Sequence, residues 1–291
     1  MNHPIALSGL NKAYADKTVL RNLDFHLPHG AVMGLLGQNG AGKTTLIQCA
    51  LGLLKPQTGS ACVFGEAAWN LGPANKQRLG YVAQEMDCFQ WMSVSQLLEY
   101  TGSFYRNWNP LRVSELVAAW GLDPGKRVSK LSPGQKQRLS IIQALGHDPE
   151  LLVLDEPVAS LDPSARRRFL KQLLEMNATQ NKSVLFSTHI TTDIERVASH
   201  VAVLKNGVIA YQGELDGLKE HVFRLRISAR SVLPDDLTIP GSLKLRVDGK
   251  AAVASVMGIG ADEIEKLSTH LNASIGIEYL SLEDIFLELH P

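Results

Sequence analysis

The stretch GQNGAGKT, residues 37–44, decides the fold of this chain because it fits the phosphate-binding pattern GxxxxGK[ST]. The apolar run AVMGLLG, residues 31–37, predicts a buried strand before it, and a helix is expected from Gly42 to about Leu53. In this context the glycines let backbone N–H groups face phosphate oxygens, and the helix N-terminus adds its partial positive charge. A glycine-rich turn without a function would require neither the strand nor the helix.

Two side chains of this loop have chemical roles of their own. Lys43 is placed to reach the β- and γ-phosphates of a nucleoside triphosphate, and the Thr44 hydroxyl is placed to ligate Mg²⁺. The expected cofactors are therefore ATP and Mg²⁺. The loop residues that we expect to contact the nucleotide are Gly37, Asn39, Gly40, Ala41, Gly42, Lys43, Thr44 and Thr45.

A second apolar run, LLVLDEP at residues 151–157, ends in two carboxylates. Ligands of open α/β sheets bind at the carboxyl ends of the strands, so both acids are expected beside the phosphate loop. There Asp155 can hold Mg²⁺, directly or through water, and Glu156 can polarise the attacking water. The alternative is a pair of solvated acids at a strand end.

The segment LSPGQKQRLSIIQALG, residues 131–146, predicts a helix with marked ends. Ser132 has N-cap chemistry, Pro133 suits the first helical position, and Gly146 can close the helix. This gives the chain a second helix N-terminus rich in donors, which a simple P-loop enzyme does not need. The alternative is a well-capped helix with a structural role only.

With this segment the chain resembles the ABC ATPase family, whose signature reads LSGGQ. The resemblance covers roughly residues 5–220 and implies that Ser132, Gly134 and Gln135 bind the γ-phosphate of ATP held by the other protomer. Pro133 departs from the family pattern and removes one backbone N–H. The lost contact is worth about 1.5–3 kcal/mol if nothing replaces it. The Ser132 hydroxyl and the Gly134 N–H remain, so a working site is expected.

Four further residues match the family's motifs in order, and each also has a plainer interpretation. Tyr14 matches the adenine-stacking aromatic, or is an ordinary strand residue. Gln84, in YVAQ, matches the glutamine that meets Mg²⁺ and water. Asp162 matches the loop that touches the opposite protomer, and also suits a cap for a helix that begins at Pro163. His189 matches the histidine that senses γ-phosphate, although a lone histidine is commonly structural.

The hydrophobic pattern of the chain, and with it the predicted secondary structure, changes twice. Strands are predicted for residues 5–27 and for the runs SVLFSTH and VAVLKNGVIAYQG. Residues 85–130 instead predict a helical insertion. The expected fold is therefore α/β: a P-loop NTPase of ABC cassette type, with a mixed sheet core, an antiparallel β subdomain and a helical subdomain. Residues 1–220 form this cassette, and residues 221–291 predict a small accessory α+β domain with helices near 261–271 and 282–289.

Composition limits the classes of protein that remain. Lysine and arginine together number 29, as do aspartate and glutamate, so nothing predicts a nucleic-acid partner. Three unpaired-looking cysteines fit a reducing compartment. No stretch has a signal-peptide core or the roughly 20 apolar residues of a membrane helix. We expect a cytoplasmic protein, held at the inner face of the cell membrane through another chain.

Three segments resemble the ATP-binding subunits of bacterial ABC-2 type exporters: FYRNWNP at 104–110, FSTHITTDIERVASHVAVLKNG at 186–207 and SLEDIFLEL at 281–289. The resemblance implies a homodimer that drives a separate integral membrane permease. The helical insertion is the expected permease contact, through residues such as Phe89, Trp91, Met92 and Tyr105, any of which also suits a core. The alternatives are a soluble mechanochemical ABC ATPase and a small-molecule P-loop kinase. The kinase would leave the LSPGQ helix and His189 without a role.

Overall fold

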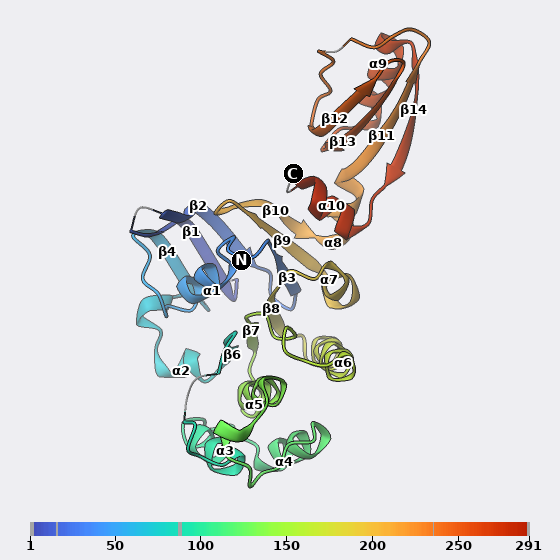
Figure 1. Cartoon of the computed structure of the whole chain (residues 1–291). Coiled ribbons are helices and arrows are strands. Elements are labelled where there is room, and N and C mark those ends of the chain that lie inside the picture. The colour runs from blue at the N-terminus through green and yellow to red at the C-terminus, as the bar shows by residue number, and fades with distance from the viewer. Residues whose placement is uncertain (1–2, 16, 87–88, 235, 290–291) are drawn as a thin grey trace. The chain divides into compact units, whose positions relative to one another are not determined.

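The computed structural model describes residues 3–15, 17–86, 89–234 and 236–289. The chain divides into two compact units, Met1–Gln212 and Gly213–Pro291. This division lies before helix α8 (Leu215–His221), whereas the sequence suggested a boundary after residue 220. The predicted boundary of the cassette, after residue 220, remains a prediction. The predicted fold class is confirmed, and each unit is described by itself (Figure 1).

The first unit contains a six-stranded sheet in the order β10-β9-β3-β8-β7-β6. Its central strands run parallel and are buried on both faces, which explains their continuous apolar sequences. Asn206 and Gly207 turn the chain between β9 and β10 with φ of 49° and 79°, as a tight hairpin requires. The strands are β3 (Val32–Leu36), β6 (Leu79–Val82), β7 (Leu151–Leu154), β8 (Ser183–Thr188), β9 (His200–Lys205) and β10 (Val208–Glu214).

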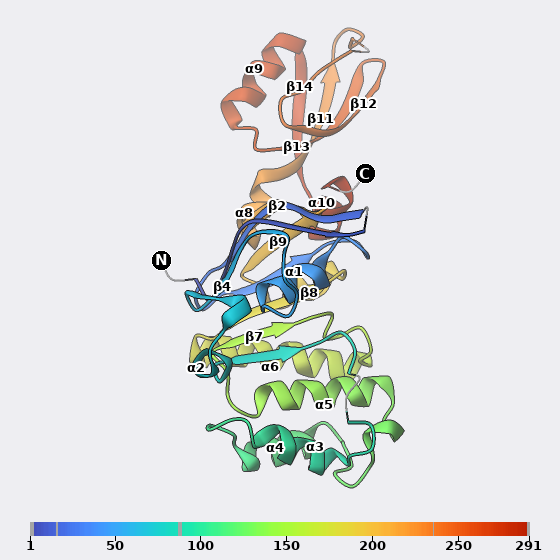
Figure 2. The same ribbon diagram turned by 90° about the vertical axis from the view of Figure 1, so that its left-hand side faces the viewer.

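A second, antiparallel sheet has the order β2-β1-β4-β5. Helix α1 (Lys43–Ala50) lies between the two sheets (Figure 2), and its Leu46 and Ile47 are fully buried in the core that they share. The P-loop that precedes α1 is thereby fixed at the ends of the parallel strands. The strands of this sheet are β1 (Ile5–Tyr14), β2 (Lys17–Leu27), β4 (Thr58–Val63) and β5 (Glu66–Ala67).

Most of the remaining helices of the first unit, α7 excepted, begin at strong local signals. Ser93 and Ser132 each form a capping box, Asn109 and Asp162 accept bonds from first-turn N–H groups, and four helices have proline at their first position. They are α2 (Pro73–Lys76), α3 (Val94–Gly102), α4 (Pro110–Ala119), α5 (Pro133–Leu145), α6 (Pro163–Gln180) and α7 (Thr191–Val197), with 3₁₀ turns at Ala68–Asn70 and Val128–Lys130.

The predicted helical insertion is α3 and α4, which lie beside α5 at one end of the first unit (Figure 1). Gln143 of α5 donates to the Thr101 hydroxyl of α3 at 2.7 Å. Trp108 packs so closely on Gly146 that a Cβ there would lie 2.4 Å from the indole ring. This glycine is therefore required by close packing rather than by its backbone angles.

The second unit is the α+β fold that its sequence predicts. Strands β11 (Val222–Ala229), β12 (Ser242–Asp248), β13 (Ala251–Met257) and β14 (Ala273–Tyr279) form an antiparallel sheet in the order β12-β13-β11-β14. Alternate residues of β11 and β13 join its core with α9 (Ala261–Leu271). In α10 (Leu282–Leu289) the apolar stripe is largely buried within the single chain, with Leu282 and Ile285 at 0% exposure.

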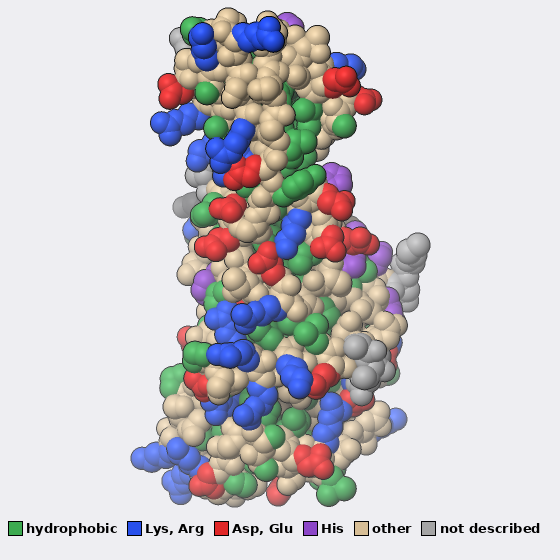
Figure 3. Space-filling view, turned by 90° about the vertical axis from the view of Figure 1, so that its right-hand side faces the viewer, with side chains coloured by type: hydrophobic (Ala, Val, Ile, Leu, Met, Phe, Trp, Pro, Cys, Tyr) green, Lys and Arg blue, Asp and Glu red, His purple; other side chains and the backbone are tan. Residues whose placement is uncertain are grey.

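Two surface properties bear on partners. On the face shown in Figure 3, basic and acidic side chains occur over both units and are not separated by sign. In the described part of the chain, no helix has the length and apolarity needed to cross a membrane.

Candidate nucleotide-binding site

The P-loop takes the backbone conformation that its glycines allow. Gly40 and Gly42 have φ of 79° and 106°, in the left-handed region that other residues rarely adopt. At Gly42 a Cβ would also lie 3.0 Å from Val19 Cγ1. No side chain caps α1, so the N–H groups of its first turn are available to an anion.

Three of the predicted residues meet through their side chains, although each follows a different strand. Lys43 Nζ lies 3.2 Å from Glu156 Oε1 and donates to the carbonyl of Gly37 at 2.8 Å. His189 Nδ1 lies 3.1 Å from Glu156 Oε2. Lys43 and Glu156 are both buried, and Glu156 itself has a φ of 48°. The carboxyl ends of β3, β7 and β8 thus gather a carboxylate, an ammonium and an imidazole around one point.

Asp155 is fully buried next to this cluster. Its Oδ1 accepts a hydrogen bond of 2.7 Å from Ser187, and the same Ser187 oxygen accepts one of 2.8 Å from the Glu156 N–H. The other carboxylate oxygen of Asp155, Oδ2, has no hydrogen-bond partner among the described residues. A buried carboxylate oxygen without a donor fits a site for Mg²⁺ or its bound water, because hard cations prefer oxygen ligands.

Ser187 is a polar site residue that the sequence analysis missed. It lies two residues before His189, near the end of a strand that is buried on both faces. A hydroxyl in such a position calls for a polar partner, and that signal could have identified it.

Beside the cluster lies a cavity of about 410 Å³. It is lined mainly by residues from the predicted site, with Gln84 entering from the end of β6. Val19 and Ala159 also line it and were not predicted. The full lining is Val19, Asn39, Gly40, Gly42, Lys43, Thr44, Thr45, Gln84, Glu156, Ala159 and His189.

Some predicted residues lie outside this cavity. Tyr14 ends β1, is 47% exposed and has Lys12 Nζ at 5.4 Å from its ring centroid. Ala41 packs against the core, so only its backbone is available to a ligand. Gly37 contributes the carbonyl that Lys43 contacts.

The signature segment forms a separate surface. Ser132 and Pro133 are exposed, and Ser132 exchanges hydrogen bonds of 3.3 and 3.0 Å with Gln135 in a capping box. Gly134 approaches the carbonyl of Ser160 so closely that a Cβ would lie 2.7 Å from its oxygen. Asp162 caps α6 through the N–H groups of residues 164 and 165, and pairs with Arg138.

Gln84 connects the two surfaces. Besides the P-loop cavity, it lines a hollow of about 300 Å³ that also reaches Pro133 and Ser160.

The pKa of Asp162 lies below its usual value, mainly because its carboxylate accepts a hydrogen bond from the Ala165 N–H. This exposed acid is therefore firmly ionised beside the signature helix.

The family model described as ABC transporter matches residues 20–159. The ABC transporter ATP-binding protein YxlF of Bacillus subtilis (strain 168) is 34% identical over 235 residues, which cover 78% of this chain and 77% of that protein. A Nod factor export ATP-binding protein I of Cupriavidus pinatubonensis is 31% identical over 295 residues, covering 98% and 90%. A methionine import ATP-binding protein of Protochlamydia amoebophila is 30% identical over 229 residues, covering 74% and 67%.

Solved structures share the fold of the first unit. The ATP-binding subunit of an ABC transporter matches with a TM-score of 0.68 at 26% identity, over 74% of this chain and 92% of that one. A dimeric ATP-binding cassette in a post-hydrolysis state, bound to ADP and phosphate, matches at 0.66 with 21% identity, over 72% and 98%. The chain therefore belongs to the family of ABC transporter ATP-binding proteins and is an ATP-hydrolysing cassette of a transporter.

Proposed function

We propose that two copies of this chain enclose two ATP molecules and that hydrolysis drives export through a separate membrane permease. The observation that carries the proposal is the separation of the P-loop cavity from the exposed start of α5. Lys43 and Glu156 line the cavity, whereas Ser132 does not. A γ-phosphate at Lys43 would meet a signature helix only if a second chain supplied one.

The chemistry follows from the cluster at the strand ends. Glu156 is the group that orients or deprotonates the attacking water, because it is the carboxylate on the cavity wall. His189 is within reach of both Glu156 and the cavity, so it can bind the γ-phosphate and sense its loss. Lys43 would exchange its contact with Glu156 for the phosphates.

The Mg²⁺ that accompanies ATP would be held by oxygen ligands of this chain. Thr44 and Gln84 line the cavity, and Asp155 offers its unpartnered oxygen, directly or through water. When bound, Mg²⁺ neutralises charge on the β- and γ-phosphates.

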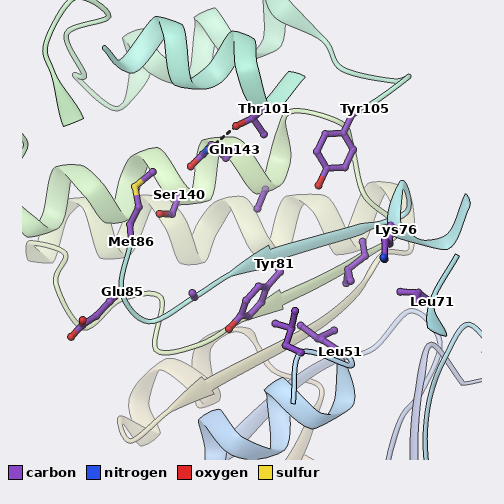
Figure 4. A pocket seen from close by; sticks show the side chains of 14 residues that line it. Leu51, Leu71, Lys76, Tyr81, Glu85, Met86, Thr101, Tyr105, Ser140 and Gln143 are labelled. Atoms are coloured by element: carbon purple, nitrogen blue, oxygen red, sulfur yellow. Dashed lines mark hydrogen bonds between the residues drawn. The ribbon is translucent and has the colours of Figure 1, made fainter. Parts of the chain in front are cut away.

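The permease is proposed to dock on a groove of about 710 Å³ (Figure 4). The groove lies over β6 and beside α5, and it receives Tyr105 from the helical insertion. Most of its lining side chains are uncharged. Trp91, another residue of the helical insertion, is 68% exposed. An apolar groove next to the Gln84 segment would let docking at the membrane influence the nucleotide site. Docking there would hold the cassette at the cytoplasmic face of the membrane.

The share of this chain that each relative matches favours export over import. The Nod factor export protein matches 98% of this chain, including the second unit. The methionine import protein matches 74%. The second unit is thus shared with a relative named for export.

Two variants test the composite site. Ser132→Arg should leave ATP binding to the isolated chain intact and block ATP-driven dimerisation, because the large cation fills the partner's side of the interface. Lys43→Ala should weaken ATP binding itself, since a point charge is lost in a confined site. Equilibrium nucleotide titration and light scattering with ATP measure the two effects. Equal loss of binding in both variants would contradict the proposal.

A second experiment addresses the permease. Affinity purification from detergent-solubilised membranes of the native host should recover a polytopic membrane protein together with the chain. Recovery of the chain alone from the soluble fraction, at native expression, would favour a mechanochemical role without transport.

A further inference from the structure

An ion pair joins the first turn of α6 to the first turn of α7. Arg166 Nε donates to Asp193 Oδ1 at 2.9 Å, and Arg166 Nη2 lies 2.7 Å from the same oxygen. The Asp193 side chain is fully buried, and the Arg166 side chain is 27% exposed. The pair therefore links the helix that follows β7 to the helix that follows β8, and these helices also pack on each other.

Stability alone does not account for this pair. The second carboxylate oxygen of Asp193, Oδ2, is buried and has no hydrogen-bond partner among the described residues. Burial of a carboxylate costs free energy, and an ion pair with an unsatisfied oxygen recovers little of that cost. Well-packed apolar side chains of similar volume would stabilise the two helices about as well. The distinctive property of the pair is its geometry, because two nitrogens of Arg166 converge on one oxygen.

Asp193 lies four residues after His189 and is connected to it by short backbone bonds. The Asp193 N–H donates to the carbonyl of Ile190 at 3.2 Å. The Ile190 N–H in turn donates to Thr188 Oγ1, at the end of β8, at 3.0 Å. A displacement of Asp193 would therefore change the position of His189 and its 3.1 Å contact with Glu156 Oε2.

The flanking contacts hold the pair from two sides. Ile194 is fully buried and packs on the strand that leads to the P-loop, since a Cβ added at Gly34 would lie 2.7 Å from Ile194 Cγ1. The Arg166 N–H donates to the carbonyl of Asp162 at 2.9 Å, so Arg166 is fixed to the start of α6. An apolar contact has no preferred direction, whereas a charge-assisted hydrogen bond has one. The ion pair is thus the directional contact of α7.

We infer that Arg166 and Asp193 are positioning residues for His189, and that their pair directs the imidazole toward Glu156 and the γ-phosphate. Neither side chain lines the P-loop cavity, so any effect on hydrolysis must pass through another residue. The inference rests on the proposed function, in which His189 binds the γ-phosphate. Because Asp162 caps the same turn of α6, a displacement of that turn by the second chain would reach His189 through this pair.

The first test compares kcat and ATP affinity in the full-length chain. Arg166→Gln should lower kcat about 10- to 100-fold, the scale of a small misplacement of a reacting group, and leave the ATP dissociation constant within about threefold. Arg166→Lys should recover most of the activity, because both nitrogens bind one oxygen and a single ammonium can do the same.

Arg167→Gln is the matched control. Arg167 is the next residue of α6, is exposed and forms no ion pair with any residue that the structure describes. This variant should keep the wild-type kcat and ATP affinity. Asp193→Asn serves if Arg166→Gln does not fold, because it leaves no buried carboxylate without a counter-ion. It should lower kcat by a smaller factor, since a neutral oxygen still accepts from Arg166.

The second test separates positioning from stabilisation. In a His189→Ala background, Arg166→Gln or Asp193→Asn should cause little further loss of kcat, because the group that the pair positions is already absent. Single-turnover hydrolysis of radiolabelled ATP resolves slow rates, and it is measured below the melting temperature of each variant. Losses that multiply with that of His189→Ala would overturn the inference. Equal kcat values in Arg166→Gln and Arg167→Gln would do the same.

A structural role and a failed proposed function give different results. If kcat, ATP affinity and melting temperature all fell together in Arg166→Gln and were not recovered in Arg166→Lys, the pair would be structural and the inference would be wrong. A wild-type rate in His189→Ala alone would instead contradict the proposed role of that histidine, and the inference with it. The single variant His189→Ala therefore distinguishes the two failures.

Discussion

The ammonium of Lys43 lies 3.2 Å from Oε1 of Glu156, and His189 approaches the other oxygen of the same carboxylate. The contact joins the P-loop to the end of β7 across the floor of the cavity. A phosphate at the loop must compete with Glu156 for this ammonium. Substrate binding and release of the carboxylate are thereby linked through one ion pair.

Replacing Glu156 with glutamine should retain ATP binding and reduce steady-state turnover by about 10²–10⁴-fold, because the amide keeps the shape but cannot accept a proton. A dimer that depends on ATP should accumulate, since γ-phosphate is not lost. Phosphate release and size-exclusion chromatography with ATP measure the two effects. Turnover at the wild-type rate would show that Glu156 is not the base.

Ser187→Ala should weaken both stability and Mg²⁺-dependent ATP binding. The change removes the donor to Asp155 and the acceptor of the Glu156 N–H, and an unsatisfied buried group costs about 1–3 kcal/mol. Ser183→Ala is the control, because its hydroxyl accepts the Gly30 N–H at the other end of the same strand. That variant should lose stability while retaining ATP affinity. Equal ATP affinity in the two variants would remove Ser187 from the site.

Pro133→Gly should fold normally and hydrolyse ATP at or above the wild-type rate. It restores an N–H at the first position of α5, at a cost of about 0.5–1 kcal/mol in backbone entropy. ATPase assays and urea unfolding are the measurements. A collapse of activity in a folded variant would mean that proline shapes the signature turn.

His147 should make the first unit acid-sensitive. It is 2% exposed and stacks on Tyr105 at 3.8 Å, and burial lowers its pKa to about 4. Because the folded pKa lies below the unfolded value of 6.5, the unfolded chain takes up the proton first, and stability falls as pH falls from about 6.5 to 4. Between pH 7 and 5 the loss is about 2 kcal/mol from this group.

The comparison that isolates this effect is His147→Phe, which keeps an aromatic ring against Tyr105. Urea unfolding followed by tryptophan fluorescence reports the first unit, because all four tryptophans precede residue 213. The variant should lose less stability between pH 7 and 5 than wild type, while exposed His29→Asn should behave like wild type. The same pH dependence in all three proteins would contradict the assignment.

A chain that ends at Glu220 should still bind ATP. It retains β10 and all of α8 except His221, and it lacks β11 to α10, whereas every residue of the P-loop cavity precedes residue 190. Nucleotide titration of the truncated protein tests this directly. A protein that is folded by circular dichroism but unable to bind ATP would show that the second unit is not an accessory.

The sequence predicted most where signals are local. The start of α5 at Pro133, the cap at Asp162 and the helix at 261–271 follow from residues that stand within one turn of each other. Ser187 was missed because its partner Asp155 is 32 positions away and is brought beside it only by the pairing of β7 with β8. The docking groove was likewise unpredictable as a shape, since its walls come from separate elements.

Residues 84–86 touch three hollows at once. Gln84 lines the P-loop cavity, all three residues line the hollow beside Pro133, and Glu85 and Met86 also line the docking groove. Adjacent Cα atoms are held about 3.8 Å apart by covalent geometry, so a displacement of Met86 in the groove is transmitted along the backbone to Gln84. This tripeptide is therefore a covalent connection between the groove and the P-loop cavity, and we expect an inserted or deleted residue within it to change how a movement at one end reaches the other.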